Sequence, residues 1–163
     1  MESVVIRDYR DCDGPALDRV AVAAFSQYSD QYSDWPAMAD RVSQMSQLAS
    51  SGQVIVAEEH GRLMGGVVYV PEGQPKLAFF DPSWSIIRLL VVDPEARGRG
   101  IGRRLTEECI ARARRDKAPL IALHTSKMMS VALPMYLRLG FELTRDAPAI
   151  YGVPYAVYAK VLG

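Results

Sequence analysis

The sequence predicts an α/β fold formed by a single domain of 163 residues. Stretches rich in apolar and β-branched residues alternate with stretches whose apolar residues recur every three or four positions, which predicts the order β-α-α-β-β-β-α-β-α-β-β. The most apolar stretch, residues 86–92, precedes a loop with three glycines in five positions and then an amphipathic segment. No repeat, low-complexity tract or linker divides the chain, and its length suffices for one hydrophobic core.

Composition and charge are those of an ordinary globular protein. Hydrophobic residues make up 49% of the chain, and 19 basic residues balance 19 acidic ones. A net charge of zero argues against nucleic acid or an anionic membrane as the principal partner. Cys12 and Cys109 form no motif, so we expect free thiols in a reducing cytoplasm and no metal. The chain shows no secretory signal and no apolar run near the roughly 20 residues of a membrane span.

The first elements are predicted from polarity patterns and turn residues. Residues 4–9 alternate as a strand does, and Gly14-Pro15 marks the start of a helix with one apolar face. A second helix is predicted from Pro36 to about Ala49, because its apolar residues share one face. Residues 53–58 and 63–70 are predicted to form a hairpin, since a polar turn containing glycine separates two apolar runs.

The second half of the chain contains the predicted central strand, residues 84–92. This strand ends at Asp93-Pro94, because proline has no N–H to continue a ladder. A helix is predicted from Ile101, where apolar residues recur at intervals of four. The remaining elements are a loop over residues 71–82, a strand over 120–124, a helix over 127–139 that Gly140 ends, and strands over 141–144 and 155–162.

The loop between the central strand and the next helix is a predicted anion site. Gly98, Gly100 and Gly102 leave its backbone bare, so several N–H groups can converge on one point. They do so at a helix N-terminus, where N–H groups have no internal acceptors and the dipole is positive. Phosphate is the natural ligand of such a site, and Arg97, Arg99 and Arg103 add positive charge around it.

Two segments carry a family resemblance. The loop has neither the Gly-Lys-Ser/Thr of a Walker motif nor the early G-x-G-x-x-G of a dinucleotide fold. Instead, Arg97-x-x-Gly100-x-Gly102 after Leu90-Val91-Val92-Asp93-Pro94 resembles the coenzyme A signature of the GNAT superfamily of N-acetyltransferases. The segment from Ala132 to Phe141 is similar to the A-x-x-x-Y-x-x-x-G-F segment of that family. The resemblance covers essentially the full length and implies a mixed, mostly antiparallel central sheet flanked by helices.

The resemblance also implies acetyl-CoA as co-substrate. Its pyrophosphate would be bound by residues 97–103, including Ile101. Its pantetheine arm would lie along the central strand at Leu90, Val91 and Val92, and an N–H near Val91 would face the thioester oxygen. Relatives often carry an asparagine where this chain has Met129, which removes one side-chain hydrogen bond to that arm.

Acetyl transfer to an amine needs a proton donor for the thiolate and an acceptor for the amine proton. Tyr136, the tyrosine of the second segment, is the candidate acid; its alternatives are orienting the sulfur or packing at the sheet edge. His124 ends a predicted strand, at a position where some relatives carry a glutamate that acts as general base through water. It is therefore the candidate base here. The alternative for His124 is a capping bond to backbone, and Glu58 and Glu59 are rival bases.

The acceptor is the least determined part of the predicted site. Apolar and aromatic residues lie in the segments that would approach it, and each is either a pocket residue or core: Tyr28, Tyr32, Trp35, Met38, Phe79, Phe80 and Trp84. No acidic cluster marks a polyamine or aminoglycoside site.

The sequence therefore predicts an acetyl-CoA-dependent N-acetyltransferase that transfers the acetyl group directly to a primary amine of a small molecule or peptide. A non-catalytic acyl-CoA-binding sensor on the same fold is the alternative. A nucleotide-binding domain that uses the same loop ranks third, since the Walker lysine is missing. The sequence leaves a homodimer open and does not name the amine.

Overall fold

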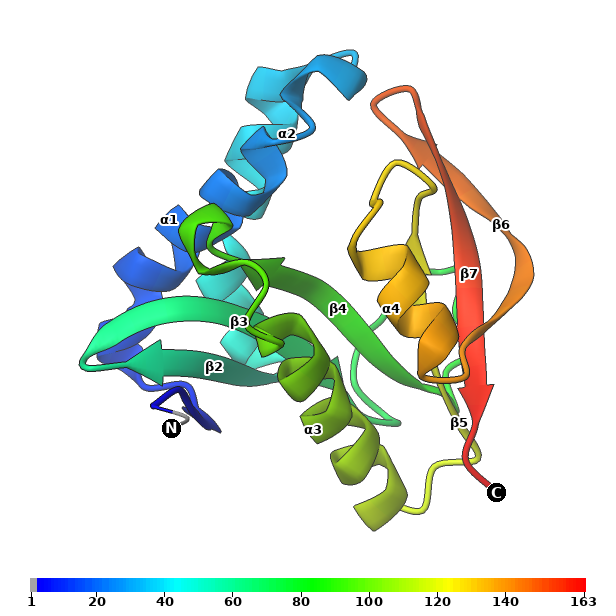
Figure 1. The fold of residues 1–163 in the computed structure, drawn as a ribbon. Coiled ribbons are helices and arrows are strands. Elements are labelled where there is room, and N and C mark those ends of the chain that lie inside the picture. Colours follow the sequence, from blue (N-terminus) through cyan, green and yellow to red (C-terminus); the bar gives the residue numbers. More distant parts are fainter. Residues whose placement is uncertain (1–2) are drawn as a thin grey trace.

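The computed structural model describes residues 3–163 and contains one seven-stranded sheet with helices on both faces (Figure 1). The strands are β1 Val5–Asp8, β2 Gln53–Glu59, β3 Arg62–Val70, β4 Ser85–Val92, β5 Leu120–Thr125, β6 Glu142–Ile150 and β7 Val153–Val161. The α-helices are α1 Gly14–Ser26, α2 Trp35–Val42, α3 Ile101–Arg115 and α4 Ala132–Arg138. Short 3-10 helices span Asp11–Asp13, Ser29–Gln31, Met45–Ser50 and Pro94–Ala96.

The strand order is β1-β2-β3-β4-β5-β7-β6, and every neighbouring pair is antiparallel except the central pair β4–β5. This confirms the predicted mixed, mostly antiparallel sheet. Strand β2 shows how its two faces are filled, because side chains alternate along a strand. Val54 and Val56 join the cluster under α1 and α2, whereas Ile55 and Ala57 join the cluster under α3 and α4.

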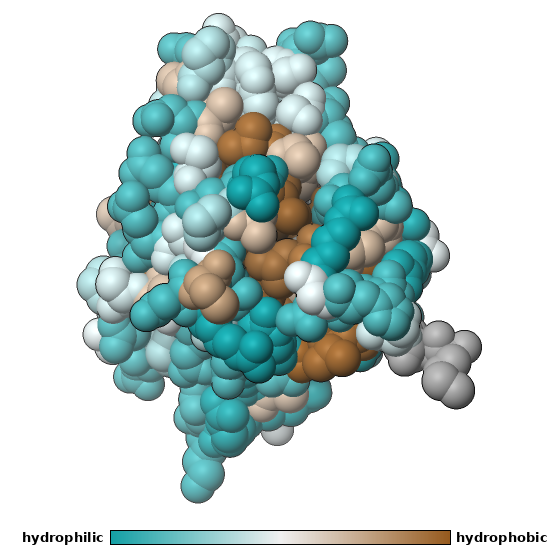
Figure 2. All heavy atoms as spheres, turned by 90° about the vertical axis from the view of Figure 1, so that its left-hand side faces the viewer, coloured by the Kyte–Doolittle hydropathy of each residue, from teal (hydrophilic) through white to brown (hydrophobic). Residues whose placement is uncertain are grey.

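Helix α1 follows its predicted apolar face closely, with Leu17 and Ala21 fully buried. Figure 2 views the molecule from the left of Figure 1, where α1 lies. Hydrophilic residues cover most of this face, and a strip of apolar residues is exposed between them. The helix therefore separates the core from solvent in the manner expected of an amphipathic surface helix.

The second predicted helix, 36–49, is wrong in its second half, because the α-helix ends at Val42 and a 3-10 helix follows from Met45. The Ser43 hydroxyl donates to the Asp40 carbonyl at 2.6 Å, which competes with the helical backbone pattern. The Ser46 N–H and hydroxyl both bind the Asp18 carboxylate of α1, at 2.8 and 2.7 Å. This tertiary anchor redirects the chain after α2.

The helix predicted over 127–139 begins only at Ala132, so its predicted start is wrong. Pro134 lies in the first turn of the shorter helix. First-turn N–H groups have no intrahelical acceptor, so proline is tolerated there, whereas it would have broken a bond inside a longer helix. The predicted end is right: Gly140 takes a left-handed conformation with φ of +98°.

Strands β6 and β7 are longer than the predicted 141–144 and 155–162. They join through Tyr151 and Gly152, both at positive φ, which is the geometry of a tight hairpin turn. Pro148 is accommodated because β6 is an edge strand and its register with β7 shifts between Ala147 and Ile150.

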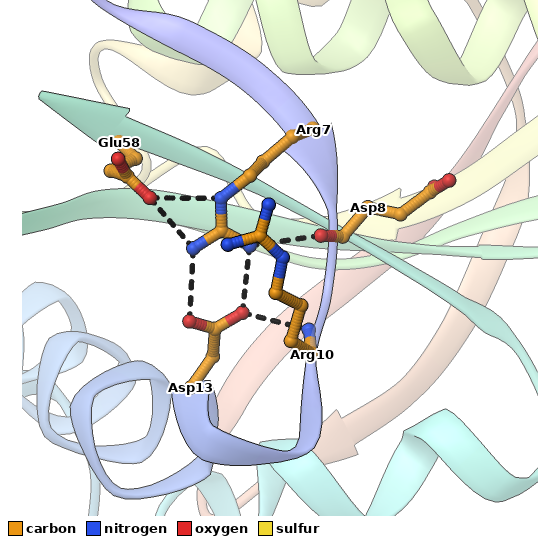
Figure 3. A network of polar contacts seen from close by, with 5 residues as sticks. All are labelled: Arg7, Asp8, Arg10, Asp13 and Glu58. Atoms are coloured by element: carbon orange, nitrogen blue, oxygen red, sulfur yellow. Dashed lines mark hydrogen bonds and ion pairs between the residues drawn. The ribbon is translucent and has the colours of Figure 1, made fainter. Parts of the chain in front are cut away.

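An ionic network fastens the start of the chain to the sheet (Figure 3). The Arg7 guanidinium on β1 donates to both Asp13 carboxylate oxygens, at 2.8 and 3.0 Å, and its Nε donates to Glu58 of β2 at 2.8 Å. The Arg10 N–H adds a bond of 2.8 Å to Asp13. Arg7 above all, with the Arg10 N–H, holds the pKa of Asp13 below its usual value, against the opposing effect of burial.

Helices long and apolar enough to cross a membrane are absent from residues 3–163. The same residues hold no group of three or more histidine, cysteine or acidic side chains arranged to bind a metal ion.

Candidate functional site

The centre of the sheet is open on one side of β4. Strands β4 and β5 pair only at Ser85↔Ile121 and Ile86↔Ala122, and beyond these pairs the strands diverge (Figure 1). The cause lies in β4, which holds one residue more than β3 between the paired positions Gly66↔Val91 and Val68↔Arg88. Leu89 absorbs this bulge with a φ of +50°, a strained conformation for a leucine. The second half of β4 therefore faces a gap instead of a neighbouring strand.

Backbone groups of β4 alternate between β3 and this gap. The Asp93 N–H donates to the Met64 carbonyl of β3 at 2.8 Å, so Val91, two residues earlier, also turns its backbone toward β3. Leu90 and Val92 direct their N–H and C=O groups into the gap. Their side chains border cavities there, whereas Val91 is buried and borders neither cavity. Of the three predicted strand positions, Leu90 and Val92 therefore border the cavities and Val91 does not.

The glycine-rich loop has the geometry that an anion site needs. Gly98 and Gly100 adopt positive φ values of +77° and +72°, and a Cβ on either would meet nothing within 4 Å. Their requirement for glycine is therefore conformational. Helix α3 begins directly afterwards, and its first intrahelical bond runs from the Arg104 N–H to the Gly100 carbonyl at 3.0 Å. The N–H groups of the first three helical residues, 101–103, are left to bind a ligand.

A cavity of about 320 Å³ lies between this loop, α1 and α4. It is bordered by Leu90 and Val92 of β4 and by the arginines Arg97, Arg103 and Arg138. The other predicted residues that border it are Gly98, Gly100, Ile101 and Gly102. No acidic side chain among the described residues borders it, so its charge suits a phosphorylated ligand.

Arg99 does not border this cavity. Its guanidinium donates two hydrogen bonds to the Glu59 carboxylate of β2, at 2.7 and 2.6 Å. The prediction that Arg99 lies with Arg97 and Arg103 around the ligand is therefore not supported. The signal in the sequence was local charge density, which does not reveal a partner 40 residues away.

A second cavity, of about 260 Å³, adjoins the first beside β4, near the bulge at Leu89. Both are bordered by Phe25, Leu90, Met129 and Ala132, so they meet where the open edge of β4 begins. Two further groups of residues surround the second cavity. The polar residues, with two tyrosines, are Arg41, Gln44, Gln47, Arg88, His124, Thr125, Tyr136 and Tyr155; the rest are apolar, many of them from α2, the following 3-10 helix and β4.

Tyr136 lies at the second cavity with its ring packed on Phe141, their centroids 5.7 Å apart. Burial raises the pKa of its phenol well above the usual value, so the group is protonated at neutral pH. Within residues 3–163 its hydroxyl has no hydrogen-bond partner, and no fully enclosed side-chain oxygen lacks one. The Tyr136 hydroxyl must therefore reach the space of the cavity.

His124 also borders the second cavity, held among aromatic rings. The ring centroids of Phe79, Phe80 and Tyr155 lie 5.2, 5.8 and 5.3 Å from that of the imidazole. Burial first, and then the charges of Arg88 and Arg41, lower the pKa of His124 to about 4. Its imidazole is therefore neutral at pH 7, and in the described part of the chain it makes no hydrogen bond.

The rival bases are occupied elsewhere. Glu58 is bound by Arg7, and Glu59 accepts hydrogen bonds from Arg99 and from the Ser3 hydroxyl. Arg99 above all, then Ser3, lowers the pKa of Glu59 to about 2. Neither glutamate borders either cavity, so they are surface ion-pair residues.

The predicted acceptor residues divide between cavity and core. Met38 borders the second cavity and Tyr28 the first, whereas Phe79 and Phe80 support His124 from outside. The Tyr32 hydroxyl bonds that of Tyr155 at 2.6 Å. The remaining two, Trp35 and Trp84, border neither cavity.

The predictions from sequence missed several residues that the fold brings to these cavities, among them Arg41, Arg88 and Tyr155. Arg88 had a usable signal, because it is the only charged residue in the apolar run 86–92. Arg41, on the helix opposite, and Tyr155, on a distant strand, had none, since only the tertiary fold places them beside Arg88.

Comparison with known proteins fits this architecture. Residues 17–141 match the profile of the acetyltransferase (GNAT) family. A mycothiol acetyltransferase from Cellulomonas flavigena is 32% identical over 109 residues. That match covers 63% of this chain, which spans only 30% of the relative's length.

Solved structures share the fold over nearly the whole chain. The PaiA N-acetyltransferase of Thermoplasma acidophilum, in complex with coenzyme A, has a TM-score of 0.73 at 17% identity, covering 99% of this chain and 100% of its own. A GNAT family acetyltransferase of Brucella melitensis, in complex with acetyl-CoA, has a TM-score of 0.66 at 25% identity, covering 98% and 88%. With a family profile matched over most of its length and with this sheet, the chain belongs to the GNAT family of acetyltransferases.

Proposed function

We propose that this protein, as a single domain, transfers the acetyl group of acetyl-CoA directly to a primary amine of a small molecule or peptide. One observation carries the proposal. The cavity beside the glycine-rich loop adjoins the cavity of Tyr136 and His124 at the open edge of β4. A ligand whose phosphates lie at the loop can thus extend along β4 and present its far end to these two side chains.

The residues present fit acetyl-CoA along this path. The free N–H groups at the start of α3, with Arg97 and Arg103, would bind the pyrophosphate. The backbone groups of Leu90 and Val92 that face the gap would bind the amides of the pantetheine arm, as an added strand does. The coenzyme complexes solved for two similar folds support this assignment.

Each chemical role then has a candidate group in this chain. Acetyl-CoA supplies the activated acetyl group as a thioester. The Leu90 N–H would donate to the thioester oxygen as negative charge develops on it. Tyr136 would give its proton to the departing sulfur; burial disfavours a free thiolate there as it disfavours a phenolate, so the transfer remains feasible. Neutral His124 would accept the amine proton, directly or through water.

Coenzyme binding is tested with a pair of glycine variants. In Gly100→Ala the left-handed residue at the start of α3 is strained, and we expect the Kd for acetyl-CoA to rise about tenfold or more. Gly61→Ala is the matched control, because Gly61 also has positive φ with nothing within 4 Å of a Cβ but lies in the β2–β3 turn. A melting-temperature shift with acetyl-CoA measures binding, and release of free thiol with a panel of amines measures transfer. Absence of both in the unmodified protein would refute the proposal.

A further inference from the structure

Arg88 is a charged side chain without a counter-ion beside the proposed reaction site. It lies on β4 one residue before the bulge at Leu89 and borders the second cavity half-buried. Its guanidinium makes no hydrogen bond or ion pair within residues 3–163. No fully enclosed side-chain nitrogen there lacks a partner, so the guanidinium nitrogens reach the cavity.

A second arginine faces the same space. Arg41 comes from α2 and also borders the cavity, and it too makes no side-chain bond within the described residues. The two are close enough that Arg41, after burial, contributes to lowering the pKa of Arg88. No aspartate or glutamate within residues 3–163 borders the cavity, and its one histidine is neutral. The cavity therefore holds two positive charges and no negative one.

Such an arrangement costs free energy in the empty protein. A half-buried guanidinium loses hydration, and a like charge nearby adds repulsion. Both costs are offset when an anion enters, and a guanidinium binds a carboxylate through two parallel hydrogen bonds. Most of the remaining wall is apolar, with Phe25, Met38 and Met45 among its residues, and its uncharged polar side chains include Gln44, Gln47 and Thr125.

We propose that the acceptor is a primary amine that also carries a carboxylate and an apolar group, with the carboxylate bound between Arg88 and Arg41. This inference rests on the proposed acetyl transfer and names the acceptor class. Arg88 and Leu90 border the same cavity, of about 260 Å³, so we place the carboxylate and the amine close together in the acceptor. An α-amino acid with an apolar side chain meets all three requirements.

The same charges assist the nucleophile. Positive charge nearby disfavours an ammonium ion and lowers its pKa, so a bound amine is held more readily in its neutral, reactive form. Diamines and polyamines, which bring a second cation, are excluded by the same field.

The proposal is tested with matched acceptors of one shape. Leucine, leucinamide and 3-methylbutylamine share the apolar group and the amine, and only leucine has the carboxylate. We expect kcat/KM for leucine to exceed that for the other two at least tenfold, measured as thiol released from acetyl-CoA. Leucyl-glycine, whose carboxylate lies one residue further away, distinguishes a peptide from a free amino acid. Putrescine is expected to react least.

Variants separate the charge from the fold. Arg88→Gln should raise KM for leucine at least tenfold and bring the ratio of leucine to leucinamide close to one, while Arg88→Lys should retain part of the preference. Arg19→Gln is the matched control, because Arg19 is exposed on α1 and borders neither cavity. Binding is measured independently of turnover as the melting shift that leucine adds to the complex of the protein with coenzyme A.

The outcomes distinguish this inference from the function on which it rests. If acetyl-CoA binds and uncharged amines or putrescine react better than leucine, the acceptor class is wrong and acetyl transfer stands. If Arg88→Gln leaves the preference for leucine unchanged, the assigned carboxylate site is wrong. If acetyl-CoA gives no melting shift and no amine releases thiol, both are refuted.

Discussion

The side chains of Tyr136 and His124 make no hydrogen bond within residues 3–163 and are held by packing, with Phe141 behind the phenol and three aromatic rings around the imidazole. Apolar surroundings fix their positions and at the same time set their protonation. Both groups are uncharged at neutral pH, because burial disfavours phenolate and imidazolium alike. A site built in this way keeps one proton donor and one proton acceptor without a fixed charge on either.

Replacing Tyr136 by phenylalanine removes the hydroxyl and keeps the ring contact with Phe141. We expect kcat to fall about 100-fold with the Kd for acetyl-CoA unchanged, since a positioned acid contributes about that much. Tyr158→Phe, another buried tyrosine that borders neither of the two cavities, is the control. Full turnover by Tyr136→Phe would exclude the acid role of Tyr136. If neither the unmodified protein nor Tyr136→Phe transfers acetyl groups but both bind acetyl-CoA, the result would favour a non-catalytic sensor.

The lowered pKa of His124 predicts an unusual pH dependence. With a pKa of about 4 the imidazole stays neutral from pH 8 down to about 5, so its availability as a base does not change near pH 6.5. The ratio of kcat/KM between the unmodified protein and His124→Gln should be constant over this range, because protonation of the free amine affects both equally. A ratio that falls as pH drops through 6.5 would show that His124 titrates normally.

Among the elements, β1 is joined to its neighbours by ion pairs, since Arg7 binds Glu58 of β2 and Asp13 before α1. Arg7→Met leaves the buried Asp13 carboxylate without its counter-ion, and we expect the free energy of unfolding to fall by about 3 kcal/mol. Arg62→Met is the control, because Arg62 pairs with Asp93 and Glu95 on the exposed surface and should cost less than about 1 kcal/mol.

The pH dependence of this loss has a definite sign. Arg7 lowers the pKa of Asp13 in the folded state, so the stabilisation is complete above the unfolded value of about 3.9 and disappears as pH falls through the folded value. The difference between the unmodified protein and Arg7→Met, measured by urea unfolding, should therefore shrink below pH 4. An equal difference at pH 3 and pH 7 would contradict this account.

At the scale of the whole molecule, the sequence predicted best what local chemistry decides. The hairpin of β2 and β3, the glycine-rich loop and the start of α3 depend on turn residues and apolar periodicity, and all are found where predicted. The C-terminal end of α2 and the start of α4 were missed. They are set by Asp18 reaching across to Ser46 and by the position of Pro134 in a first turn.

The residues of the candidate site also divide into those that local sequence predicts and those that only the tertiary structure reveals. The left-handed backbone positions Gly98 and Gly100 were predictable from residue type alone. The bulge at Leu89 was not, because no glycine marks it, and the bulge decides that Leu90 and Val92, not Val91, face the gap. Ion pairing was equally unpredictable: Arg99 pairs with Glu59, whereas Arg88 pairs with no acid among the described residues, although both are arginines in adjoining segments.

Strands β4 and β5 are joined by only two ladder pairs, fewer than any other neighbouring strands of the sheet, so the strand pairing is weakest in the middle of the sheet. One half of the molecule is built on β1 to β4 and the other on β5 to β7, and few main-chain hydrogen bonds join the two halves of the sheet. A molecule that lies along the free edge of β4 would contact both halves of the sheet. Binding of a ligand there and the rigidity of the two halves relative to each other are therefore coupled. The short β4–β5 pairing that leaves room for a ligand weakens the contact between the two halves in the empty protein, and a molecule bound along β4 restores that contact.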